Sequence, residues 1–139
     1  MRETNIFEKG LSSLINVVFV SIFFMPFLFL NNSILIKKFI FISLFFIYKL
    51  ILIAFNEDRS VGMIFMKTYW KRKYSLKNQL IHTILYTISF STLLFWLYFP
   101  FDIFLVNILF IQVPIILLKG TTLHGYLAGR MVTVKISVK

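Results

Sequence analysis

The chain has 139 residues and a formal net charge of +10, from 15 Lys and Arg residues against 5 Asp and Glu residues. It is 59% hydrophobic and 14% charged, whereas soluble proteins are about 45–50% apolar and about 25% charged. A soluble core of this size cannot bury 18 Phe residues together with the many Ile and Leu residues. The composition therefore indicates an integral membrane protein.

Several kinds of chemistry are absent from the sequence. It contains no Cys, which excludes disulfides and thiolate sites, and two His residues are too few for a His-rich metal cage. It has neither a Gly-rich phosphate loop nor a Gly-x-Ser-x-Gly motif. We expect no catalytic residue, no cofactor and no metal, and a protein that is not an enzyme. The basic residues lie between apolar runs, so we expect anionic lipid headgroups as the partner and no nucleic acid.

Four apolar stretches are each close to the 20 residues or so that cross a bilayer. They predict an all-α membrane protein with four transmembrane helices, arranged as two hairpins in a single domain over residues 1–139. Asn31-Asn32-Ser33 marks the turn of the first hairpin, and Pro100 marks the turn of the second. The predicted spans are residues 11–30, 37–55, 78–98 and 102–119.

The polar stretch 56–77 mixes basic, apolar and aromatic residues, which is typical of a segment lying on the membrane surface. An ordinary solvated loop is the alternative. The residues expected to contact headgroups or a partner are Lys67, Tyr69, Trp70, Lys71, Arg72 and Lys73.

The tail, residues 120–139, changes character. Residues 123–129 are expected to form a short interfacial helix. From Val132 to Val138, β-branched and polar residues alternate, which is a strand signal. A lone strand needs a partner, so we expect a two-stranded pairing with residues 65–71 on the cytoplasmic side.

The positive-inside rule gives the orientation. With four spans, the N-terminus, the 56–77 loop and the tail share one side, which carries twelve Lys and Arg residues, while the opposite side carries Lys37 and Lys38. Both termini are therefore expected in the cytoplasm.

Polar residues inside spans are costly in lipid and indicate contacts or function. The candidates are Asn16, Lys49, His82, Asn107 and Gln112. Lys49 is expected to snorkel to the nearer headgroups, and a buried, paired Lys49 is the functional alternative. Asn107 and Gln112 are five residues apart, about 140° around an α-helix, so they need not share a face. Hydrogen bonds between helices are expected of these residues, with an ion or proton path as the alternative.

Simpler roles are expected for the remaining ionisable residues. Glu57 and Asp58 are adjacent and are expected to end one helix or cap the next, together with Ser60. His82 is expected to be an interfacial polar residue, and His124 to hydrogen-bond backbone near the headgroups. A proton-carrying role is the alternative for both His residues.

The tail from Thr122 to Val134 resembles the ending of the RDD family of small bacterial membrane proteins, a Thr-Leu-His-Asp segment followed by Leu-Ala-Gly and a Val-rich strand. Ser60-Val61-Gly62 resembles the Gly-x-Thr-x-Gly-Lys start of that family's loop. The family has an Arg in the first helix and an Asp seven residues later, and here Lys9 and Asn16 stand at that spacing. The tail Asp is replaced by Gly125, so all three residues that name the family are changed.

The resemblance implies a multi-pass protein of the bacterial inner membrane, whose relatives are proposed to act in cation or proton antiport or as accessory proteins. Asn and Gly do not titrate, so cation transport is less expected here than in a typical member. We therefore expect a non-enzymatic accessory or structural subunit of a larger membrane complex, binding other subunits or itself. The alternatives are a small oligomeric cation or proton transporter and a surface-binding module built on residues 67–77.

Overall fold

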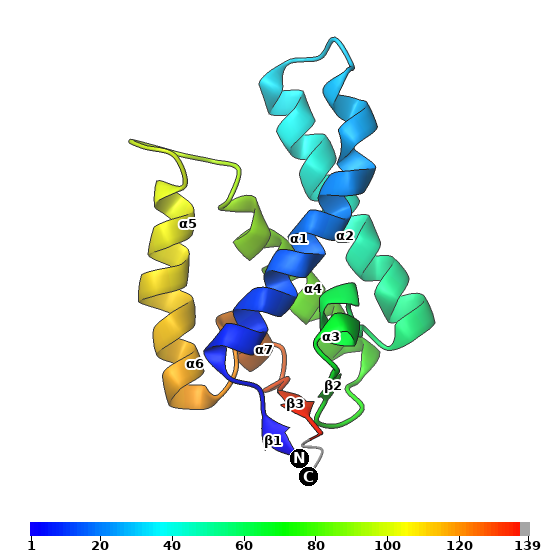
Figure 1. The fold of residues 1–139 in the computed structure, drawn as a ribbon, viewed down its shortest axis with the longest axis vertical. Coiled ribbons are helices and arrows are strands. Elements are labelled where there is room, and N and C mark those ends of the chain that lie inside the picture. Colours follow the sequence, from blue (N-terminus) through cyan, green and yellow to red (C-terminus); the bar gives the residue numbers. More distant parts are fainter. Residues whose placement is uncertain (137–139) are drawn as a thin grey trace.

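The structure, a computed structural model, describes residues 1–136 and is mostly helical with one small sheet (Figure 1). Three helical stretches are long and apolar enough to cross a membrane, namely α1 (Ile6–Leu28), α2 (Ile34–Asn56) and residues Asp102–Lys119. Their lengths and compositions fit the membrane protein that the sequence predicts. The four spans of the prediction are not all present as long helices.

The boundaries of α1 and α2 follow from local side chains. Asn5 accepts a hydrogen bond from the Glu8 backbone N–H, and the Glu8 carboxylate accepts one from the Asn5 N–H, so α1 begins with a capping box. At the start of α2, the Ser33 hydroxyl accepts a hydrogen bond from the Ile36 backbone N–H. The far end of α2 is closed by Glu57 in the left-handed conformation, a common way for a helix to end.

The third predicted span is shorter than expected. Helix α4 (Leu76–Ser91) has 16 residues and ends before Thr92, so the predicted helix over 78–98 is wrong for residues 92–98. The loop that follows folds around Asp102, whose carboxylate accepts hydrogen bonds from the backbone N–H groups of Leu97 and Tyr98. These bonds satisfy backbone groups that a longer helix would have satisfied internally.

The last apolar stretch is helical over the range predicted, but it is not a regular α-helix. It consists of α5 (Asp102–Val106), the π-helical η1 (Asn107–Gln112) and α6 (Val113–Lys119). A π-helix bonds residues five apart, and the Gln112 Nε2 therefore donates to the Asn107 Oδ1 at 3.2 Å. The two side chains share a face, which α-helical spacing did not predict.

A three-stranded antiparallel sheet closes one end of the molecule, in the order β1–β3–β2. Strand β2 (Thr68–Trp70) pairs with β3 (Thr133–Lys135), which confirms the predicted pairing of the loop with the tail. Strand β1 (Arg2–Glu3) adds a third strand that the sequence analysis missed. The predicted strand residues beyond Ile136 lie outside the described part of the chain.

The short helices α3 (Val61–Phe65) and α7 (Leu123–Leu127) lie near this sheet. Helix α7 falls where a short helix was expected in the tail. Helices α1, α2 and α4 pack around the aromatic core formed by Val20, Phe41, Phe45 and Phe90. In this core the rings of Phe45 and Phe90 stack with centroids 4.1 Å apart, an arrangement that adds to the burial energy.

Gly62 sets how closely α3 approaches α1. A Cβ at this position would collide with the Ser12 carbonyl and lie 2.8 Å from the Ser12 Oγ. By contrast, Gly10 on α1 has open space around it. The two glycines therefore form a matched pair with different roles.

We expect Gly62→Ala to lower the free energy of unfolding in detergent micelles by roughly 1–3 kcal/mol, because the added methyl overpacks the α1–α3 contact. Gly10→Ala is the control, and it is expected to raise helix stability by about 1 kcal/mol. Equal effects of the two substitutions would show that the close approach is unimportant.

Candidate functional site

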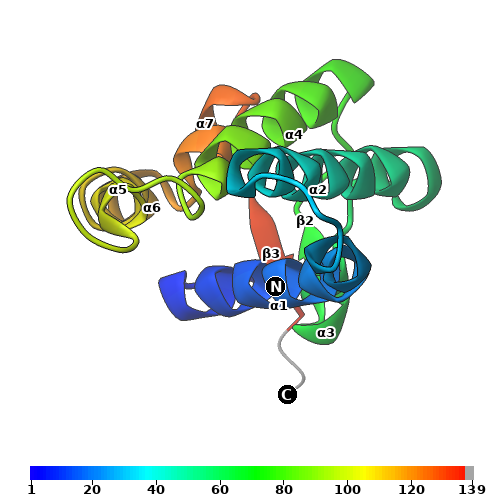
Figure 2. The same cartoon turned by 90° about the horizontal axis from the view of Figure 1, so that it is seen from above.

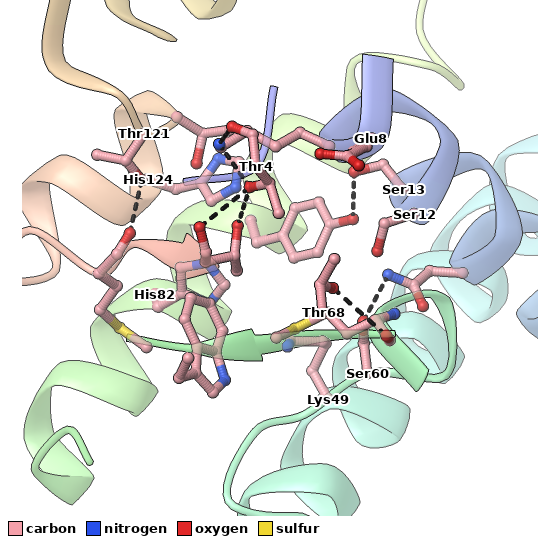
Figure 3. A pocket seen from close by; sticks show the side chains of 18 residues that line it. Thr4, Glu8, Ser12, Ser13, Lys49, Ser60, Thr68, His82, Thr121 and His124 are labelled. Atoms are coloured by element: carbon pink, nitrogen blue, oxygen red, sulfur yellow. Dashed lines mark hydrogen bonds between the residues drawn. The ribbon is translucent and has the colours of Figure 1, made fainter. Parts of the chain in front are cut away.

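A polar cavity of about 70 Å³ lies where α1, α2, α4, α7 and the sheet meet (Figure 3). This volume is several times what one water molecule needs. Ser12, Ser13 and Asn16 line it from α1, Lys49 from α2, and His82 from α4. In a molecule with an apolar exterior, so many converging polar side chains need a reason.

The cavity-lining Lys49 forms an ion pair, through its Nζ, with the Oδ1 of Asp58, which does not itself line the cavity. The Lys49 side chain is 1% exposed and that of Asp58 is 0% exposed. Lys49 therefore does not snorkel, contrary to the expectation from the sequence. Glu57 ends α2 and Ser60 caps α3, as expected of this segment, whereas the Asp58 carboxylate pairs with Lys49. Burial withdraws each charge from water, and only the partner charge offsets that cost.

His82 extends this pair toward the tail. Its Nδ1 lies 3.2 Å from the Asp58 Oδ2, within contact distance but not aligned as a hydrogen bond. Its ring is 5.0 Å from the ring of His124, which stacks on Tyr86 at 4.7 Å. Both His residues are buried, so neither occupies the interfacial position expected from the sequence.

The His124 Nδ1 is buried and makes no hydrogen bond within residues 1–136. A buried polar nitrogen without a partner is rare and costly. His124 lines the cavity together with His82 and Tyr86. The cavity can therefore supply the missing partner, in the form of a water molecule or a small ion.

Asn16 ties the loop after α2 to the first helix. Its Oδ1 accepts hydrogen bonds from the Gly62 N–H at 2.8 Å and from the Tyr48 hydroxyl at 3.0 Å. Its Nδ2 donates to the Ser60 Oγ at 3.1 Å. A neutral amide both donates and accepts, so it satisfies three neighbours without needing a counter-charge.

The surroundings of Asp58 and His124 lower the pKa of both side chains. Burial acts to raise the pKa of Asp58, but the charge of Lys49 and the contact with His82 outweigh it and hold that pKa below the usual 3.8. Burial lowers the pKa of His124 well below 6.5, and electrostatic interaction with His82 and Lys49 lowers it further. At neutral pH Asp58 is therefore ionised and His124 is neutral.

The structure brings six of the predicted site residues to this cavity. They are Lys9, Asn16, Lys49, Trp70, His82 and His124. Gly62 lies beside it through its hydrogen bond to Asn16.

Asn107 and Gln112 belong to a separate polar connection. The Asn107 Nδ2 donates to the Ser89 Oγ at 2.8 Å, and the Gln112 Oε1 accepts from the Leu123 N–H at 3.0 Å. These bonds between segments match the expectation for polar residues in spans. They join the last helical stretch to α4 and α7 rather than to the cavity.

Sequence reasoning missed the central role of Asp58. The available signal was the pairing of an acid with Lys49 nine residues earlier, one of the few charges within an apolar run. Glu57 and Asp58 both have positive φ, 50° and 60°, and this turn folds the carboxylate back onto α2. Nothing in the helical periodicity predicts such a turn.

Comparison with known proteins identifies no relative. No family model matches the chain, and neither a curated protein nor a solved structure matches it. The function must therefore be argued from the cavity itself.

We expect Asp58→Asn to lower the free energy of unfolding by roughly 3–5 kcal/mol, because it leaves the Lys49 charge buried without a partner. Asn tolerates the left-handed backbone at this position, so the substitution removes charge without adding strain. The double variant Lys49→Met/Asp58→Asn should recover most of the loss. The measurement is a double-mutant cycle by denaturation in micelles, and additive losses would contradict the pairing.

The same pair predicts a pH dependence. Because the Asp58 pKa is lower in the folded state than in the unfolded state, its stabilisation is present above about 3.8 and is lost as the pH falls through the folded-state value. The double variant should lack this part of the acid transition.

Proposed function

We propose that this chain is a small, non-enzymatic transport protein of the membrane that binds a proton or a small cation at the polar cavity. One observation carries the proposal: ionisable groups on α1, α2, α4 and α7, including a buried His124 nitrogen with no partner in residues 1–136, converge on one cavity. Buried ionisable groups in membrane proteins commonly mark ion and proton pathways. Asp58 supplies the titratable carboxylate that the sequence analysis judged to be lost.

The chemistry of the cavity suits a proton better than a metal. The described residues contain no cluster of three metal-ligating side chains, whereas Asp58, His82 and His124 succeed one another at contact distances. A neutral imidazole can accept a proton at one nitrogen and release one from the other. The positive charge of Lys49 lowers the affinity for a second cation, which favours release.

The RDD-like assignment is part of this proposal. The positions that carry the resemblance, Lys9, Asn16, Gly62 and His124, line one cavity or bond to it. Such convergence supports a shared layout with that family, in a bacterial inner membrane with both termini cytoplasmic. The proposal includes α4 and the loop after it as the remaining membrane-inserted segment.

We expect the wild-type protein, reconstituted in liposomes, to dissipate a proton gradient, and we expect His124→Gln to reduce that flux at least about tenfold by removing a proton-accepting group. Ser21→Ala is the matched control, because the Ser21 hydroxyl bonds only the Val17 carbonyl of its own helix. Absence of wild-type flux under proton and monovalent cation gradients would refute transport.

A second candidate, an accessory subunit of a larger assembly, is favoured by the placement of residues 102–119. Figures 1 and 2 show α5 and α6 standing to one side of α1, α2 and α4. The stretch exposes Phe110, Leu117 and Leu118, an apolar surface that another subunit or a second copy can cover.

If assembly uses this face, affinity purification in mild detergent should retain a partner or a second copy of the chain. The paired substitution Phe110→Ala/Leu118→Ala should release it. Phe29→Ala is the control, because Phe29 is equally apolar and is exposed at the turn between α1 and α2. Recovery of the wild type only as a free monomer would contradict this candidate.

A further inference from the structure

A second hollow lies on the other side of Trp70 from the polar cavity. It is a surface groove of about 480 Å³ between the end of α2, strand β2 and the start of α4. This volume lies within the range of about 300–1,000 Å³ that is usual for small-molecule sites. Trp70 lines both hollows and donates from its Nε1 to the Asp58 backbone carbonyl.

The groove combines basic and aromatic side chains. The Arg59 guanidinium lies 4.0 Å from the Tyr69 ring centroid, and that of Arg72 lies 5.2 Å from the ring of Tyr74. Each Arg is held by one hydrogen bond to a backbone carbonyl, Arg59 to Thr68 and Arg72 to residue 129. Stacking and a single bond fix the plane of a guanidinium and leave most of its five N–H donors for a ligand.

Every acid of this chain already has a partner, and one of them, Glu57, lines the groove beside its partner Lys73. Glu3 pairs with Lys71, Glu8 with Arg2 and Lys135, Glu57 with Lys73, and Asp58 with Lys49 and His82, while Asp102 accepts backbone N–H bonds. These five are all the Asp and Glu residues present. Within residues 1–136, no carboxylate pairs with Arg59 or Arg72, so both guanidinium groups are available to an anion from outside the chain.

The position of the groove indicates where that anion comes from. Phe55, the last aromatic residue of the apolar helix α2, lines the groove and is 86% exposed. Tyr and Trp residues gather at the headgroup level of a bilayer, and here Tyr69, Trp70 and Tyr74 surround the same hollow. The groove therefore lies where the apolar helix α2 ends, a position suited to the phosphates of a bilayer that this helix crosses.

We propose that this groove binds the phosphate headgroup of an anionic phospholipid, with Arg59 and Arg72 as the charged donors. Guanidinium groups bind phosphate oxygens with two parallel hydrogen bonds, which Lys cannot do. This proposal reduces the headgroup-contacting surface that the sequence predicted to a smaller set of residues. Arg72, Lys73, Tyr69 and Trp70 line the groove, whereas Lys67 and Lys71 do not. It is independent of the transport proposal because it uses different side chains.

The test is to reconstitute the full chain in nanodiscs that contain phosphatidylcholine and a minority of phosphatidylglycerol. After gentle release, native mass spectrometry counts the lipids that remain bound. The wild type should retain phosphatidylglycerol in preference to phosphatidylcholine. Arg72→Gln should lower that retention about tenfold through the loss of a charge-assisted hydrogen bond, and Arg72→Lys should lower it less.

Lys67→Gln is the matched control, because Lys67 lies in the same basic segment but outside the groove, and it should leave retention unchanged. A thermal melt of each variant tests folding, and Arg72 is exposed, so its substitution should not move the midpoint. Equal loss in Lys67→Gln, or equal retention of the two lipids, would overturn the proposal. Displacement of the lipid by excess inorganic phosphate or by an acidic peptide would assign the groove to those ligands instead.

Discussion

The ion pair between Lys49 and Asp58 is the constraint on which the rest of this structure depends. Two opposite charges with almost no access to water can persist only if both remain in place. Keeping them together requires the left-handed turn at Glu57 and Asp58, which directs the chain back along α2 into α3. That return brings Gly62 against α1 and allows Asn16 to bond the loop.

The parts of the fold that depend on the pattern of apolar and polar residues could be predicted from the sequence. Apolar runs identified α1, α2 and the stretch 102–119, and strand alternation identified the pairing of β2 with β3. The end of α4 could not be predicted, because it depends on the Asp102 carboxylate accepting hydrogen bonds from backbone N–H groups in the preceding loop. The alignment of Asn107 with Gln112 needed a π-helix, which residue spacing alone does not reveal.

The same distinction applies to the candidate site, where hydropathy marked some residues and only long-range contacts define the role of others. Hydropathy singled out Asn16, Lys49 and His82 as polar residues in costly places, and the structure brings them to one cavity. The role of Asp58 was not predicted, because an acid that follows a helix ordinarily lies in solvent. The availability of Arg59 and Arg72 could not be predicted either, because it depends on the acids pairing with other basic groups in the folded chain.

The sheet also imposes an order on the making of this protein. Its central strand β3 and the imidazole of His124 follow every membrane-spanning helix in the chain, so the ribosome produces them after those helices have begun to insert. Until β3 and His124 have been synthesised, β1 and β2 have no strand to pair with, and Asp58 and His82 lack the neighbouring His124. Such distant contacts form slowly, so the polar centre closes as a late step of biogenesis, after the apolar helices have already found their places in lipid.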